Sequence, residues 1–191
     1  MLQKRLRQET AEKHRRLEEG LGLVAPDLTL GRYRRILEGF YTFLRPWEAG
    51  IETALGDPAF TRPRRRAHLL AADLVQLGAA AGSLAALPDC PALPLIDGPA
   101  RAMGSLYVME GSTLGGRIVA RHVEKALCLS DGRGYTYFSS HGPAVGAMWR
   151  RFLDRLAAFS SPDRDDQVVA AAQETFDSME RWLCGSGGAS R

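Results

Sequence analysis

Apolar residues recur every three or four positions along most of the chain, which is the spacing of one face of an α-helix. Residues 2–19 and 29–50 both show it, and Thr29 is placed to cap the second segment. Pro46 is expected to bend or end that second helix, because proline has no backbone N–H. In the first segment four residues share one face: Leu6, Thr10, His14 and Leu17.

Further helices are expected in the rest of the chain. Thr61 and Pro63 open a third helix, and the proline-rich segment "LPDCPALPLIDGP" is a connection. Asp97 as cap and Pro99 in the first turn then begin a long helix that reaches about residue 127. Two more helices are expected over residues 142–159 and 162–184, the second opened by Ser161 and Pro162.

No strand pattern, repeat or internal linker emerges, so the sequence predicts an all-α fold with a single domain over residues 1–184. The last residues, 185–191, are small and polar and are expected to form a disordered tail. A length of 191 residues is enough for one sizeable hydrophobic core.

Composition excludes several classes of protein. The formal net charge of +3 is small for a protein that binds nucleic acid through its phosphates. The N-terminus has no apolar signal-peptide core, and no segment is apolar enough to span a membrane. Three widely spaced cysteines form no zinc or redox motif, so we expect a reducing, cytoplasmic setting.

The stretch "LYVMEGSTLGGRIVARHV" is unusual for the interior of a helix. It contains Gly111, Gly115 and Gly116, and each interior glycine costs a helix about 1 kcal/mol relative to alanine. Gly111 and Gly115 share one face, where missing side chains admit either a neighbouring helix or a large flat ligand. Ser112 and Thr113 compete for backbone carbonyls and favour a kink.

His14 lies on the apolar face of the first helix, where a lone histidine is either a core residue or a ligand. Glu18, one turn later, is placed to accept the Nδ1 proton and leave Nε2 free for a metal. Arg7 is two turns earlier, roughly 10.5 Å away by helical rise. An imidazole, a nearby cation and a glycine-lined face together suit a heme group.

These segments resemble the bacterial heme oxygenases, particularly those that supply biliverdin to bacterial phytochromes. The resemblance lies in "LRQETAEKHRRLE", "YVMEGSTLGGRI", "YFSSHGPAVGAMWRRF" and "AAQETFDSMERWL", in order along nearly the whole chain. It implies a helical bundle that holds heme b, as both substrate and cofactor, between the first helix and a kinked glycine-rich distal helix.

The resemblance also implies roles for individual residues. His14 takes the position of the iron ligand, oriented by Glu18, and the three glycines place backbone directly over the iron. The propionate-binding positions fall on Arg7 and Tyr107, and a pocket-wall position falls on Phe176. The aspartate that animal-type enzymes carry on this helix is missing here, which leaves backbone groups and the Ser112 hydroxyl to hold water.

The implied reaction opens the ring with dioxygen and yields biliverdin, the α isomer, together with carbon monoxide and ferrous iron. No flavin or nicotinamide motif occurs, so electrons would come from a separate reductase or ferredoxin. A bacterial phytochrome is the implied recipient of the biliverdin.

Other readings stay open at this point. One is a heme carrier or sensor of the same fold, and another is a diiron oxidase, although no Glu-x-x-His motif occurs. A third is a nucleic-acid module that uses "RPRRR", which is more simply a solvated helix start. The other histidines are assigned no ligand role: His122 lies two turns from the iron position, His68 follows the arginine run, and His141 is placed to cap a helix.

Overall fold

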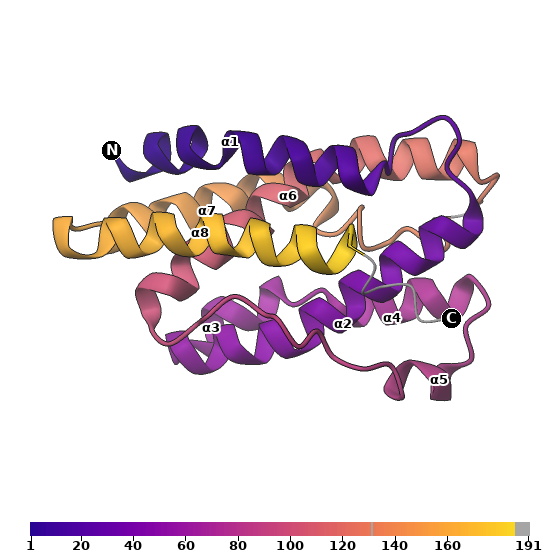
Figure 1. Cartoon of the computed structure of the whole chain (residues 1–191), viewed down its shortest axis with the longest axis horizontal. Helices are drawn as coiled ribbons and strands as arrows, with labels where there is room; N and C mark the ends of the chain where they lie inside the picture. Colours follow the sequence, from indigo (N-terminus) through magenta and orange to yellow (C-terminus); the bar gives the residue numbers. More distant parts are fainter. Residues whose placement is uncertain (131, 186–191) are drawn as a thin grey trace.

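The computed structural model describes residues 1–130 and 132–185 (Figure 1). Its helices are α1 (Leu2–Leu21), α2 (Leu30–Leu55), α3 (Pro58–Thr61), α4 (Ala67–Gln76), α5 (Ala81–Ala85), α6 (Pro99–Ala126), α7 (Val145–Phe159) and α8 (Pro162–Leu183). No strand occurs in the described part of the chain, which confirms the all-α prediction. Most of the expected tail, residues 186–191, lies outside it.

Helix α8 lies at the centre of the helix packing, because both α6 and α1 pack along it. Helices α2 and α4 form a second pair, and in Figure 1 they lie below α1 and α8. Within the described residues α1 and α6 make few contacts with each other, although each packs on α8. Two helices held apart by a third leave space between them for a ligand.

Small residues let α6 approach its neighbours closely. A Cβ at Gly104 would overlap the backbone carbonyl of Val168 in α8, so this position needs glycine. Helix α6 is α-helical from Pro99 to Ala126 without interruption, despite its interior glycines. In Figure 1 it rises steeply at its start and then runs in the direction of α1, so the helix changes direction as the sequence predicts.

Thr29 caps α2 as expected, but Pro46 does not end that helix. The Thr29 hydroxyl accepts a hydrogen bond from the Arg32 N–H at 3.2 Å. Helix α2 continues nine residues beyond Pro46, to Leu55. Proline cannot donate to the Thr42 carbonyl one turn earlier, and that carbonyl accepts the Cys90 N–H instead, at 3.0 Å. A bond from the connecting segment thus replaces the missing bond of the helix.

Two predicted helix starts are wrong. Residues 58–64 form a short α-helix and a 3₁₀ turn, and α4 begins only at Ala67. The Glu48 carboxylate of α2 caps it by accepting the N–H groups of Arg66 and Ala67, at 2.6 and 3.0 Å. The N-cap of α6 is Gly98 and not Asp97, whose carboxylate lies 3.7 Å from Arg101. Local sequence could not reveal a cap that comes from another helix.

Candidate functional site

A largely apolar cavity of about 470 Å³ lies between α1 and α6. Its volume falls within the range of pockets that hold small molecules and cofactors. Helix α6 contributes residue 108, residues 111–116 and residues 118–119. The remaining lining residues are His14, Leu17, Glu18, Leu21, Leu23, Val24, Phe40, Arg66, Tyr137, Phe138, Phe176 and Met179.

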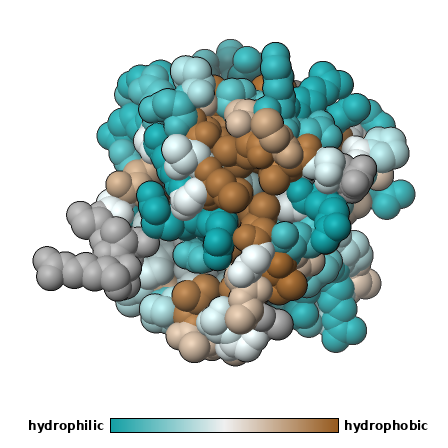
Figure 2. All heavy atoms as spheres, turned by 90° about the vertical axis from the view of Figure 1, so that its right-hand side faces the viewer, coloured by the Kyte–Doolittle hydropathy of each residue, from teal (hydrophilic) through white to brown (hydrophobic). Residues whose placement is uncertain are grey.

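Large apolar side chains are exposed where the cavity meets the surface. Val24, Leu114 and Ile118 all line the cavity and are 54%, 48% and 69% exposed. Figure 2 views the molecule from the right-hand end of Figure 1 and shows apolar residues gathered in a band bordered by polar ones. Exposed apolar surface rimmed by polar residues is typical of interaction surfaces and of ligand-binding grooves.

His14 borders the cavity and is not a core residue. Its side chain is 50% exposed, and its ring centroid lies 5.7 Å from that of Phe176. The ring faces Glu18 through Nε2, at 3.3 Å from Oε1, and not through Nδ1 as the sequence argument expected. Nε2 is the outer nitrogen of the ring, so it reaches furthest toward a carboxylate one turn away. Half a turn of the ring about Cβ–Cγ exchanges each nitrogen with a ring carbon, so it would take Nε2 away from this carboxylate.

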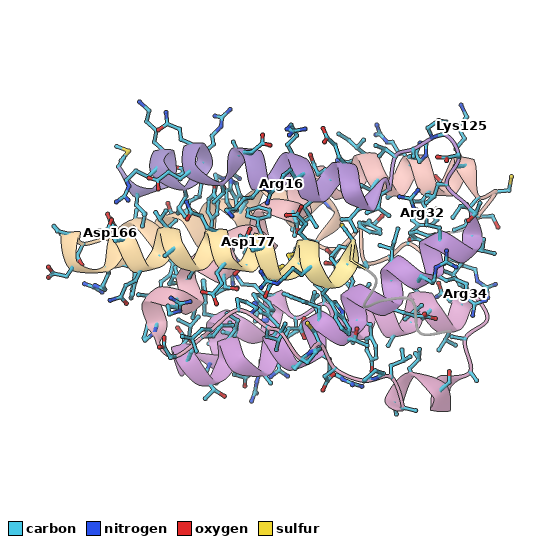
Figure 3. The ribbon with its side chains drawn as sticks, viewed as in Figure 1. Arg16, Arg32, Arg34, Lys125, Asp166 and Asp177 are labelled. Carbon is cyan, nitrogen blue, oxygen red and sulfur yellow. The ribbon has the colours of Figure 1, made fainter. Side chains whose placement is uncertain are left out.

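Ion pairs fix α1 against α8 beside His14. Lys13 lies 2.5 Å from Asp177, and Arg16 lies 2.7 Å from Glu180. Figure 3 labels Arg16 and Asp177, which come from these two helices and lie next to each other. These bonds position the turn of α1 that carries the imidazole, and Phe176 of α8 supplies the neighbouring ring.

The glycines of α6 divide into two kinds. A Cβ at Gly115 would meet nothing within 4 Å, and one at Gly111 would only touch the Trp149 ring at 3.8 Å. A Cβ at Gly116 would overlap the carbonyl oxygen of Phe138. Close packing therefore explains Gly116, whereas Gly115 leaves open space at the cavity.

The hydroxyls within the glycine stretch bond to their own helix, as the sequence predicts. Ser112 donates to the Met109 carbonyl at 2.9 Å, and Thr113 donates to the Glu110 carbonyl at 2.6 Å. Because its proton is used in this way, the Ser112 hydroxyl can only accept a hydrogen bond from a molecule in the cavity.

The structure brings Arg7 and Tyr107 near each other but leaves both outside the cavity lining. Burial raises the pKa of Tyr107, and the charge of Arg7 opposes that rise. The Tyr107 ring packs on Trp149, with centroids 5.7 Å apart. Arg7 is exposed and makes no ion pair within the part of the chain that the structure describes.

Arg66 is a cavity residue that the sequence argument missed. Of the "RPRRR" run, which was expected to be solvated, Arg64 and Arg66 are buried. Arg66 Nη2 donates to the Met109 carbonyl at 2.6 Å, and its guanidinium lies 5.2 Å from the centre of the Tyr137 ring. The 3₁₀ turn before Arg66 breaks helical spacing, so periodicity could not show that alternate arginines point inward.

The aromatic loop between α6 and α7 forms another wall of the cavity. Buried Asp73 of α4 accepts hydrogen bonds from the N–H and hydroxyl of Thr136 and from the N–H of Tyr137, at 2.6–2.9 Å. Burial raises the pKa of Asp73, while these bonds lower it. They hold Tyr137 and Phe138 in the lining. The aromatic content of the loop was the only signal in the sequence.

The remaining histidines lie outside the cavity lining. His122 Nε2 is 3.0 Å from the Ala25 carbonyl, and His68 is exposed. His141 stands at the N-cap position of a 3₁₀ turn, but its side chain makes no capping hydrogen bond, which corrects the expected cap.

The rival readings lose support from the geometry. Among the described residues, no group of three or more His, Cys, Asp and Glu side chains is placed to hold a metal ion. Burial of two arginines of "RPRRR" weakens the nucleic-acid reading. Within residues 1–130 and 132–185, no helix is long and apolar enough to span a membrane.

Comparisons with known proteins agree with this arrangement. The family model described as "Heme oxygenase" matches residues 1–184. A protein named heme oxygenase from Xanthomonas campestris pv. campestris (strain 8004) is 36% identical over 149 residues, which cover 77% of this chain and 81% of that protein.

Two solved structures share the fold. The NO- and CO-bound heme oxygenase from Neisseria meningitidis superposes with a TM-score of 0.81 at 22% identity, covering 100% of this chain and 94% of that one. The heme oxygenase from Leptospira interrogans gives 0.74 at 17% identity, covering 96% and 98%. With the family model and the Xanthomonas relative, the conclusion is that this chain belongs to the heme oxygenase family, enzymes whose substrate is heme.

Proposed function

We propose that this chain cleaves heme b with dioxygen and reducing equivalents to biliverdin, carbon monoxide and ferrous iron. The observation that carries the proposal is the open space at Gly115 in the same apolar cavity that His14 borders. A porphyrin is a flat apolar disc, so it needs a slot with one ligating side chain and one wall without side chains. We assign this activity to a domain of residues 1–184.

His14 is proposed as the iron ligand. Among the described residues its imidazole is the one histidine ring of the cavity lining, and Glu18, whose Oε1 lies 3.3 Å from Nε2, is proposed to accept the proton of the ring nitrogen that does not bind iron. Phe176 packs beside the imidazole and restricts its rotation. Iron binding through Nε2 would require this nitrogen to leave its contact with Glu18.

The opposite wall, with Gly111, Gly115 and Gly116, is proposed to direct the oxidation. With no side chain at Gly115, dioxygen has room to lie over the edge of the porphyrin, where a meso carbon of the same heme is the nearest target. Backbone groups and the Ser112 hydroxyl, as an acceptor, are proposed to hold water there.

Arg7 and Tyr107 are proposed to anchor the propionates. Their place outside the apolar lining supports this role, because charged carboxylates are costly to bury and remain at the solvent edge. Exposed Arg7 has no anionic partner among the described residues and is available to a carboxylate. Anchoring at this edge is proposed to select the α isomer.

Two partners complete the proposal. The sequence contains no flavin or nicotinamide motif, so a separate reductase or ferredoxin would supply electrons. A bacterial phytochrome is the proposed recipient of the biliverdin, on the sequence resemblance alone.

The test is a hemin titration of the full chain, followed by turnover. We expect a sharp Soret band that saturates at one hemin per chain. Addition of reductant and oxygen should then replace that band with a bilin spectrum. Absence of a Soret band would contradict heme binding, and a stable Soret band without bilin would indicate a carrier or sensor.

A further inference from the structure

One hydrogen bond joins the two sides of the cavity directly. His122 Nε2 of α6 lies 3.0 Å from the carbonyl oxygen of Ala25, which belongs to the loop between α1 and α2. Among residues 1–130 and 132–185, this is the one hydrogen bond or ion pair that links α6 to α1 or to this loop. Without the His122 side chain, the loop would have no polar tie to α6.

The chemistry of the bond fixes the role of each partner. A carbonyl oxygen can only accept, so Nε2 of His122 carries a proton and donates it. The Ala25 carbonyl also accepts the Leu28 N–H, at 3.2 Å. Removal of the imidazole would therefore leave this carbonyl paired within the loop. A variant without the imidazole loses the tie to α6 and leaves no unpaired group on the loop side.

The loop after α1 is braced by its own hydrogen bonds. One turn closes from the Ala25 N–H to the Gly22 carbonyl at 3.1 Å, and the next closes from the Leu28 N–H to the Ala25 carbonyl. At the start of the loop, Arg32 of α2 donates to the Leu21 carbonyl at 3.1 Å. The shape of the loop is thus set locally and by α2, whereas its polar tie to α6 comes from His122 alone among the described residues.

The bond lies at one end of the cavity. Leu23 and Val24 line the cavity from the loop, directly before Ala25. Ile118 lines it from α6, one helical turn before His122. In Figure 1 the loop passes α6 at the right-hand end of the molecule. The bond therefore holds the two sides of the cavity together next to the side chains that form its rim.

We propose that His122 is a positioning residue, which holds the loop against α6 and keeps Leu23 and Val24 at the edge of bound heme. Outward movement of the loop has to break this bond, so the bond slows the release of heme from the cavity. This role rests on the proposed function. His122 acts through the Ala25 carbonyl and touches neither the iron nor the dioxygen, since it lies outside the cavity lining.

The first test needs no heme and measures the loop directly. Amide hydrogen exchange in the ligand-free protein reports local opening of the loop through the N–H groups of Ala25 and Leu28. In His122→Ala these two amides should exchange about fivefold faster, the factor that corresponds to the loss of one ordinary hydrogen bond. His122→Gln places an amide donor at a similar distance from the backbone and should restore the wild-type rate.

Two outcomes of this test would overturn the proposal. One is unchanged exchange of both loop amides in His122→Ala. The other is equal acceleration of the slowest core amides, which would indicate a loss of global stability instead of a release of the loop. If His122→Ala does not fold, His122→Phe keeps a ring without the donor, and the same outcomes apply to it. His68→Ala is the matched control, because it removes the same side chain from an exposed position outside the cavity lining.

The second test follows the transfer of hemin from the ferric complex to an excess of apomyoglobin. Hemin should leave His122→Ala about fivefold faster than it leaves the wild type, whereas His122→Gln and His68→Ala should match the wild type. Magnetic resonance of the ferric complexes should show the same nitrogen ligation in every variant, because His122 is not the iron ligand.

The results of the two tests separate the proposals. An unchanged rate of hemin transfer, or a loss of nitrogen ligation in His122→Ala, would overturn the role of His122 as a positioning residue at the heme edge. Failure of the wild type to bind hemin would instead overturn the proposed function. The exchange measurement would still decide whether His122 holds the loop.

Discussion

Gly116 packs against the carbonyl oxygen of Phe138 so closely that no Cβ fits between them. This contact joins α6 to the aromatic loop, and it fixes the distance between two walls of the cavity. The neighbouring Gly115 faces open space. Close packing thus requires glycine at position 116, whereas position 115 has room for a side chain. Substitutions at the two positions should therefore have opposite effects on the stability of the ligand-free protein.

Alanine at these two positions should separate packing from ligand space. Gly116→Ala should destabilise the ligand-free protein by about 2 kcal/mol, because its methyl group overlaps a backbone oxygen that cannot yield easily. Gly115→Ala should stabilise it by up to about 1 kcal/mol through helix propensity. Urea unfolding measures the change in the free energy of unfolding of each variant. Equal decreases for the two variants would contradict the conclusion that only Gly116 is required for packing.

A larger side chain at Gly115 should stop the reaction without unfolding the protein. Gly115→Leu should still bind hemin, since nothing packs against this position. The leucine would fill the space in which dioxygen must bend toward the porphyrin edge, so most bilin formation should be lost. Single-turnover spectra record this directly. Wild-type bilin yield in this variant would mean that the open space has no part in the chemistry.

Removal of the His14 imidazole should change the ligand of the iron while the heme cavity itself stays intact. We expect His14→Ala to bind hemin more weakly, with an altered spectrum and little bilin. Added imidazole should enter the vacated space and restore part of the activity. His68→Ala, at an exposed position outside the cavity lining, is the matched control. Magnetic resonance of the ferric complexes should show nitrogen ligation in the control and its loss in His14→Ala; coincident spectra would refute the assignment.

The position of ring opening should depend on how the propionates are held. The wild type should yield the α isomer of biliverdin. An Arg7→Ala, Tyr107→Phe double variant should yield a mixture, because the porphyrin can then rotate in an otherwise apolar cavity. Chromatography of the extracted products distinguishes the isomers. A wild-type product dominated by the β or δ isomer would overturn the anchoring argument.

Glu110 should make the protein less stable as pH rises. Burial raises its pKa above the ordinary 4.5, although Arg66 and Arg64 oppose the rise. Between pH 4.5 and the higher folded pKa, the folded state binds more protons than the unfolded state, so the free energy of unfolding falls with increasing pH. The Glu110→Gln variant has no ionisable group at this position, so its free energy of unfolding lacks this pH dependence. Its free energy of unfolding relative to wild type should therefore increase from pH 4.5 upward, and a difference that is constant with pH would contradict the buried environment.

The long helices could be predicted because their signals are local. Apolar spacing located α1, α6 and α8 to within about two residues at each end and found the start of α2, which Thr29 caps as expected; the end of α2 lies five residues beyond its predicted position. The start of α4 could not be found in this way, because its cap is the Glu48 carboxylate from another helix. A bond between residues 18 positions apart leaves no trace in local periodicity.

The candidate site was predictable only in part, for the same reason. His14, Glu18 and Phe176 and the stretch from Gly111 to Gly116 do line one cavity. Arg66 was missed because an arginine run resembles solvated surface until tertiary contacts bury it. The loop that carries Tyr137 takes its shape from Asp73, which lies more than 60 residues earlier in the chain.

The bond between Cys90 N–H and the Thr42 carbonyl has a consequence for how the sequence can vary. The donor is a backbone group, so any residue except proline at position 90 can make the bond. The length of the connecting segment is constrained more strongly than its sequence. One inserted or deleted residue would move the donor away from the Thr42 carbonyl, which has no helical partner because Pro46 lacks an N–H. Related chains that keep Pro46 should therefore tolerate substitutions in this connection far better than changes in its length.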